Sequence, residues 1–212
     1  MPEPVPFPET LTTPRLTLRV PTAADGPEMA EIINANLEYL GRWLPWAQTP
    51  RTSERQSESM AQAHDRFLRT EDLMYLIVQG GRIIGSTGIH RIDWDVPVGD
   101  IGYWVAKAET GHGYVTEAAQ AQTELALRPV SAGGLGFERI EIRCDPHNAR
   151  SAAVPTRLGY TLEARLKRNA RAADDASQLR DTLVFARWPS GAGKAEAERR
   201  GKTLKDVWEH WP

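Results

Sequence analysis

Alternation of apolar and polar residues predicts strands along much of the chain. Arg15 to Val20 alternates polar and apolar side chains, as a strand with one buried face does. Gly80 and Gly81 separate two apolar runs and predict a hairpin turn between them. The further strands are predicted at residues 74–79, 82–93, 100–105, 138–145, 160–168 and 179–187.

Apolar residues recur at helical spacing between these strands. Met29, Ile32, Ile33, Leu37 and Leu40 share one face of a single predicted helix. In front of this helix, Thr22 and Asp25 form a capping-box pattern. Further helices are predicted at residues 53–70, 116–127 and 148–158, and an aromatic loop at 41–46 separates the first helix from the second.

The order of these elements predicts an α/β fold with a mixed sheet. Three antiparallel strands are followed by strand–helix–strand units, which implies helices on the faces of the sheet. We expect an irregular lead-in over residues 1–10, one domain over 11–188 and a C-terminal extension over 189–212. In that extension, apolar residues at 204, 207, 208 and 211 predict an amphipathic helix. It would dock on its own domain or on a second subunit, which leaves a homodimer open.

Composition narrows the range of partners. The chain has 212 residues, 41% hydrophobic and 25% charged, with a net charge of -2, so nothing favours nucleic acid or anionic membranes as partners. No apolar run approaches the ~20 residues that span a bilayer, and the N-terminus lacks a signal-peptide pattern, so we expect a cytoplasmic protein. The single cysteine, Cys144, excludes an internal disulfide and a multi-cysteine metal site, and we expect no metal.

A glycine turn between a strand and a helix is the first candidate site. Gly111-His112-Gly113 would present the free N–H groups of a helix N-terminus, where the helix dipole favours a phosphate. The pattern alone is weak, because an ordinary strand-to-helix turn has it too. It lacks the Lys-Ser or Lys-Thr of a P-loop, and Thr116 stands where a dinucleotide-binding fingerprint has its third glycine.

A second group of polar residues follows the next strand. Asn148 and Ser151 are three residues apart at the start of a predicted helix, so their side chains share one face. Asn148 could equally be a simple N-cap. Pro155, inside the same range, predicts a short or kinked helix.

In this order, these segments resemble the GNAT superfamily of N-acetyltransferases, and most closely its RimJ/RimL-like branch. That branch includes ribosomal-protein N-terminal acetyltransferases. The resemblance covers residues 10–188 and implies the GNAT fold, a mostly antiparallel central sheet splayed between the strands at 101–105 and 138–144, with helices on both faces. It rests on the segments at residues 13–19, 39–46, 101–105, 111–118, 148–151, 158–163 and 180–181.

The resemblance implies that acetyl-CoA binds in the splayed opening. The pantetheine arm would pair with the backbone around Trp104 and Val105, and Asn148 and Ser151 would lie near its thiol end. The pyrophosphate would rest on the backbone amides of Gly111, His112, Gly113, Tyr114, Val115 and Thr116.

Two departures from the family pattern matter. Ala108 stands where the family usually has Gln or Arg, which removes one phosphate contact. Pro155 stands where many members have a tyrosine that donates a proton to the leaving thiolate. Ser151 is therefore the candidate to meet the thiolate, with a purely local backbone contact as its alternative role.

The acceptor side has several candidate residues. Asp100 ranks first as the proton acceptor, ahead of Glu117, and His90 is the alternative that titrates near neutral pH. Asp100 could instead be a solvated turn residue, and Glu117 could simply stabilise the helix dipole. Cys144 could carry the acetyl group covalently or be a core thiol. Residues assigned to the acceptor pocket are Trp43, Trp46, His90 and Tyr103, and the two tryptophans could also staple the first two helices together.

The function implied is acetyl transfer from acetyl-CoA to a primary amine, by direct attack in a ternary complex. The leading acceptor is the α-amino group of a protein. The alternatives are acetylation of a small amine, such as an amino acid, an antibiotic or a polyamine, and a non-catalytic acyl-CoA-binding module.

Overall fold

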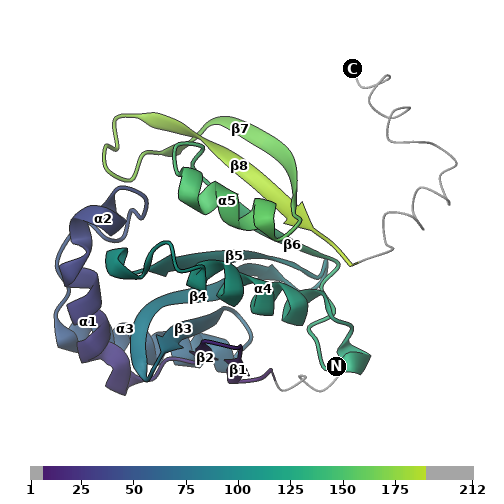
Figure 1. Ribbon diagram of the computed structural model, residues 1–212, viewed down its shortest axis with the longest axis horizontal. Coiled ribbons are helices and arrows are strands. Elements are labelled where there is room, and N and C mark those ends of the chain that lie inside the picture. Colours follow the sequence, from purple (N-terminus) through teal and green to yellow (C-terminus); the bar gives the residue numbers. More distant parts are fainter. Residues whose placement is uncertain (1–6, 190–212) are drawn as a thin grey trace, which may run out of the picture.

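The computed structural model describes residues 7–189, so the predicted helix in the C-terminal extension lies outside the described residues. The described part of the chain forms one eight-stranded sheet with helices on both faces, as Figure 1 shows. The strand order is β1-β2-β3-β4-β5-β6-β8-β7, and neighbouring strands are antiparallel except for the parallel pair β5 and β6. The predicted mixed α/β fold is confirmed.

The elements follow the predicted order, with one strand added at the start. The strands are β1 Thr10–Thr12, β2 Thr17–Arg19, β3 Leu73–Gln79, β4 Arg82–Asp93, β5 Val98–Val105, β6 Arg139–Cys144, β7 Thr161–Arg171 and β8 Leu179–Arg187. The α-helices are α1 Gly26–Ala35, α2 Leu37–Gly41, α3 Ser53–Leu68, α4 Tyr114–Leu127 and α5 Ala149–Arg157. Short 3-10 turns lie at Ala23–Asp25, Lys107–Glu109 and Val130–Ala132.

The helix predicted over residues 29–40 is in fact two helices, and Asn36 breaks it. The Asn36 side-chain amide donates to the carbonyl of Ile32 at 2.8 Å and so caps the end of α1. Its Oδ1 accepts the N–H of Lys107 at 2.8 Å, which ties the break to the segment after β5. The apolar pattern runs through the break because α1 and α2 both bury residues, so periodicity alone could not detect it.

The sheet opens between β5 and β6. These strands pair only where Val98–Asp100 faces Arg139–Glu141, and beyond that point β6 pairs with β8 alone. The N–H of Ala106 donates to Ile84 of β4 at 2.8 Å. Because an antiparallel ladder alternates, the backbone polar groups of Tyr103 and Val105 point away from β4, into the opening. The predicted splay is confirmed.

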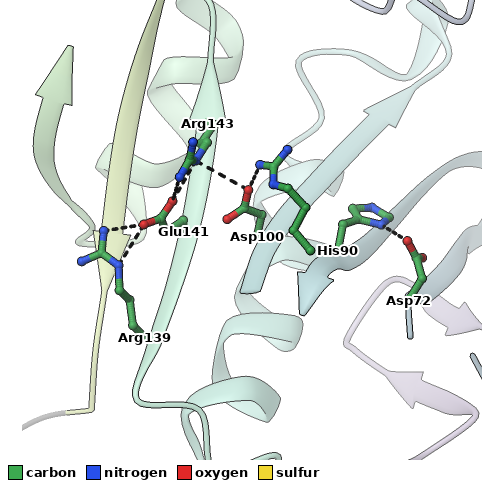
Figure 2. A network of polar contacts seen from close by, with 7 residues as sticks. Asp72, His90, Asp100, Arg139, Glu141 and Arg143 are labelled. Carbon is green, nitrogen blue, oxygen red and sulfur yellow. Dashed lines mark hydrogen bonds and ion pairs between the residues drawn. The ribbon is translucent and has the colours of Figure 1, made fainter. Parts of the chain in front are cut away.

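Charged side chains join the strands at the base of this opening, as Figure 2 shows. The Asp100 carboxylate of β5 is ion-paired with Arg91 of β4 and lies 3.6 Å from Nε of Arg143 on β6. On β6, Glu141 accepts hydrogen bonds from Arg139 at 2.9 Å and from Arg143 at 2.8 Å. The row of charges therefore crosses β4, β5 and β6 where the strands are still paired.

The helices cover the two faces of the sheet unequally. On one face, α4 and α5 pack over the main core, and α4 buries residues along most of its length. On the other face, α1 and α3 form a smaller cluster around Met29, Met60, Leu76 and Ile83. None of the helices in the described range is long and apolar enough to cross a membrane.

A buried hydrogen bond fixes α4 on the sheet and supplies a test of the fold. Thr87 Oγ1 donates to Oε1 of the fully buried Gln122 at 2.6 Å. Thr87→Val removes this donor and leaves a buried carbonyl unpaired, so we expect a loss of about 1–3 kcal/mol in the free energy of unfolding, measured by urea denaturation. The control Thr10→Val, on an exposed position of β1, should change it by less than about 0.5 kcal/mol. Equal stability of both variants would contradict this account of the α4 contact.

Candidate functional site

A cavity of about 1470 Å³ lies at the opening between β5 and β6. Its walls come from both faces of the sheet, since Trp43 follows α2 on one side and Val154 belongs to α5 on the other. Between them, residues 101–105 of β5 form a strand edge with free backbone donors and acceptors. The cavity can therefore bring together two reactants that enter from opposite faces.

The glycine turn forms one end of this cavity. Gly111 and Gly113 have φ angles of 86° and 80°, in the left-handed region that residues with a Cβ rarely adopt. Gly113 is the N-cap of α4, and the N–H of Glu117 makes the first helical hydrogen bond, to its carbonyl. The N–H groups of residues 114–116 therefore lack helical partners and can bind an anion.

Arg15 adds a positive charge to the glycine turn, a contribution that the sequence analysis missed. Its NH1 donates to the carbonyl of His112 at 2.9 Å, and its guanidinium lies 4.9 Å from the centre of the Tyr114 ring. The side chain is half exposed and lines the cavity. In the sequence, Arg15 was notable only as part of the segment at 13–19 that contributes to the family resemblance. It is 97 residues away from His112, so the contact could not be read from the sequence.

Glu117 holds Arg15 in place. Its carboxylate accepts from Thr13 Oγ1 at 2.6 Å, from the Arg15 backbone N–H at 2.9 Å and from Arg15 Nε at 2.7 Å. Burial raises the pKa of Glu117, but the hydrogen bonds from Thr13 and Arg15 outweigh it and lower the pKa overall. A carboxylate with a low pKa and this many donors is a poor proton acceptor. We therefore assign Glu117 a positioning role instead of the proton-accepting role expected from the sequence.

Three side chains meet where α5 faces β5. Asn148 caps α5 by accepting the Ser151 N–H at 3.1 Å. Ser151 Oγ lies 3.4 Å from the Tyr103 hydroxyl, which donates to the Ser151 carbonyl at 3.1 Å. Tyr103 was assigned to the acceptor pocket, but its side chain lies on the α5 side of β5, next to Ser151. Burial raises the pKa of Tyr103, so its hydroxyl stays protonated and can keep Ser151 oriented.

Cys144 lines the cavity next to this group but is suited to packing. It is buried at the end of β6, and burial raises the pKa of its thiol to about 11. Only the thiolate is a strong nucleophile, so this thiol is a poor candidate to carry an acetyl group at neutral pH.

On the opposite face, the loop after α2 covers the opening. Trp43 lines the cavity, whereas Trp46 packs against Trp104 with ring centres 5.8 Å apart. Gln48 Nε2 donates to the carbonyl of Ala173, between β7 and β8, at 2.9 Å. The loop after α2 and the β7–β8 hairpin are therefore joined across the opening.

The two remaining candidates for the proton acceptor lie next to this opening and not in the cavity wall. Asp100 is occupied by its ion pairs with Arg91 and Arg143. His90 lies opposite Asp100 on β4, and its Nδ1 is 2.8 Å from Oδ2 of Asp72. Among the described residues, no group of three or more His, Cys, Asp or Glu side chains could hold a metal ion.

The role of Glu117 predicts a pH-dependent contribution to stability. Because its pKa is lowered in the folded protein, Glu117 stabilises the fold above its unfolded pKa of ~4.3, and this contribution is lost as the pH falls through the folded value. Glu117→Gln should lower Tm at pH 7, and the difference from wild type should shrink below about pH 4. The control Glu58→Gln, at an exposed position of α3, should follow wild type. A difference independent of pH would rule out this role of the charge.

Comparisons with known proteins agree with the geometry. The family described as Acetyltransferase (GNAT) domain matches residues 15–161. The ribosomal-protein-serine acetyltransferase of Escherichia coli (strain K12) is 28% identical over 74% of this chain and 83% of its own length.

Solved structures share the fold. A RimL structure, described as a ribosomal L7/L12 alpha-N-protein acetyltransferase in complex with coenzyme A, superposes with a TM-score of 0.77 at 24% identity, covering 85% of this chain and 98% of that one. The microcin C7 self-immunity acetyltransferase MccE, in complex with acetyl-CoA and AMP, gives a TM-score of 0.74 at 21% identity, covering 83% and 93%. Because the family model matches residues 15–161, well over half of the chain, the chain belongs to the GNAT family and is an acetyltransferase.

Proposed function

We propose that the protein transfers an acetyl group from acetyl-CoA to a primary amine, by direct attack while both substrates are bound. The observation that carries this proposal is the free edge of β5 at residues 101–105, which forms part of a cavity with walls on both faces of the sheet. One substrate can bind along the backbone of this edge, while the second substrate approaches it from the other face of the sheet.

The residues at the glycine turn fit the charged part of coenzyme A. The free N–H groups of residues 114–116 and the guanidinium of Arg15 suit a pyrophosphate. The free backbone groups of Tyr103 and Val105 suit the amides of a pantetheine arm, a refinement of the predicted pairing around Trp104 and Val105. The structural neighbours RimL and MccE were solved with coenzyme A and acetyl-CoA respectively.

Acetyl transfer also needs the thioester carbonyl to be polarised and the thiolate to be stabilised. A backbone N–H on the free edge of β5 can serve the carbonyl, because it is fixed by the sheet and needs no reorganisation. Ser151 is the group we assign to the thiolate, since Asn148 and Tyr103 fix its position. Pro155 lies buried within α5 and has no proton to donate.

For the acceptor, we propose the α-amino group at the N-terminus of a protein. The E. coli relative is named for a ribosomal protein, and RimL is described as an alpha-N-protein acetyltransferase. Gln48 and Ala173 are also in contact across the opening, and an opening bridged in this way admits the end of a protein chain more easily than the middle of a folded chain. The same contact would suit a small amine, which is the second candidate.

Ser151→Ala should test the proposed transfer directly. Loss of a hydrogen bond to a charged sulfur costs about 1.5–3 kcal/mol, so kcat should fall about 10-fold to 100-fold while the Kd for coenzyme A stays within about twofold. Thiol release from acetyl-CoA is measured with peptides that have a free N-terminus, with N-terminally blocked peptides that contain lysine, and with small amines.

The control for this test is Ser59→Ala, at an exposed position on α3, which should keep the wild-type rate. A full rate in Ser151→Ala would remove Ser151 from the reaction. If no amine in the panel stimulates thiol release by the wild type, the proposed transfer is contradicted. Preference for small amines over all peptides would favour the second candidate.

A further inference from the structure

We propose that His90, oriented by Asp72, is the group that takes the proton from the attacking amine. This inference rests on the proposed acetyl transfer and adds the residue that would accept the proton. A histidine–carboxylate pair stands next to the free edge of β5, on the face of the sheet opposite to α4 and α5.

The pair has the geometry that fixes an imidazole tautomer. His90 Nδ1 lies 2.8 Å from Oδ2 of Asp72, the residue immediately before β3. A carboxylate accepts a hydrogen bond, so in the neutral ring the proton resides on Nδ1 and Nε2 carries a lone pair. The His90 side chain is 37% exposed and that of Asp72 is 24% exposed, so the pair is partly open to solvent.

Two glycines make room for the His90 ring beside the free edge. Gly88 on β4 pairs with Gly102 on β5, and the imidazole lies over both. A Cβ on Gly88 would lie 3.0 Å from His90 Nε2, and a Cβ on Gly102 would lie 3.2 Å from the same atom. Gly102 also lines the cavity, so Nε2 lies close to a residue of the cavity wall.

The two carboxylates that the sequence offered as proton acceptors are both engaged by arginines. Asp100 lies opposite His90 on β5 and is ion-paired with Arg91. Figure 2 shows its second ion pair, with Arg143. Glu117 is held by Thr13 and Arg15 at the far end of the cavity. The charged residues next to His90 are Asp72, its cross-strand partner Asp100 and the following residue Arg91, which is ion-paired with Asp100. Of these, Asp72 is the one with a hydrogen bond to the imidazole.

The proton can be followed through the proposed step. As the amine nitrogen bonds to the thioester carbonyl carbon, Nε2 of His90 takes the proton that this nitrogen loses, directly or through one water. The C–S bond breaks and its electron pair leaves on sulfur as a thiolate that Ser151 stabilises. The imidazolium, stabilised by the Asp72 carboxylate, then returns its proton to solvent.

The experiment compares His90→Asn and Asp72→Asn with wild type in amine-stimulated thiol release from acetyl-CoA. An asparagine at position 90 keeps a donor for Asp72 and removes the Nε2 lone pair, so kcat should fall by ~100-fold with the Kd for coenzyme A and Tm near wild type. Asp72→Asn should lower kcat less and alter the acid limb of the pH–rate profile. In His90→Asn that limb should be lost, and the rate should recover as the pH approaches the pKa of the acceptor amine.

Two other histidine variants make the test specific. His64→Gln removes a histidine from α3, where its Nδ1 contacts the Pro21 carbonyl away from the cavity, and it should keep the wild-type rate and pH profile. His147→Gln removes the other histidine–aspartate pair, with Asp145 at the start of the segment leading to α5. If His147→Gln loses the acid limb, or if His90→Asn keeps kcat within twofold of wild type, the inference is overturned. Absence of amine-stimulated release by the wild type would overturn the proposed transfer itself.

Discussion

The early end of the pairing between β5 and β6 is the constraint on which the site depends. The two strands are parallel neighbours over only three residues each, and β6 then follows β8 while β5 keeps β4. A strand in the middle of a sheet normally forms hydrogen bonds with a neighbouring strand on each side. Here the backbone N–H and C=O groups of Tyr103 and Val105 have no strand beside them and remain free for a ligand. The buried Asp100 and the partly buried Glu141, each bound by arginines, join the strands where the opening begins.

The parts of the site sit at different positions along this edge. The glycine turn and Arg15 occupy the end near α4, whereas Ser151 and Tyr103 lie on the α5 side of the strand. His90 lies on the opposite side. It pairs with Asp100 of β5, and paired residues on neighbouring strands share a face, whereas Tyr103 is at an odd position of β5 and points to the other face. The alternation of the strand thus places Ser151, which we propose for the leaving sulfur, and His90, which we propose for the incoming amine, on opposite faces.

Most of the fold could be predicted from the sequence, because strand alternation and helical periodicity depend on residues close together in the chain. The bounds predicted for β4 are those observed, and the Gly80-Gly81 turn lies where expected. The break at Asn36 is hidden by an apolar pattern that runs through it, and the contact that Asn36 makes with Lys107, 71 residues away, forms only in the folded chain. The contacts of Glu117 and Tyr103 could not be predicted for the same reason, since Thr13, Arg15 and Ser151 reach them only in the folded chain.

The contact between Arg15 and the glycine turn has a thermodynamic consequence. Arg15 lies in the connection between β1 and β2, and it reaches the turn only when that hairpin is docked through Glu117. An anion that binds Arg15 and the turn together must therefore favour the docked hairpin, and by linkage the docked hairpin must favour the anion to the same degree. The connection between β1 and β2 is in this sense part of the anion site that we propose for the coenzyme, although the turn it contacts lies 97 residues further along the chain.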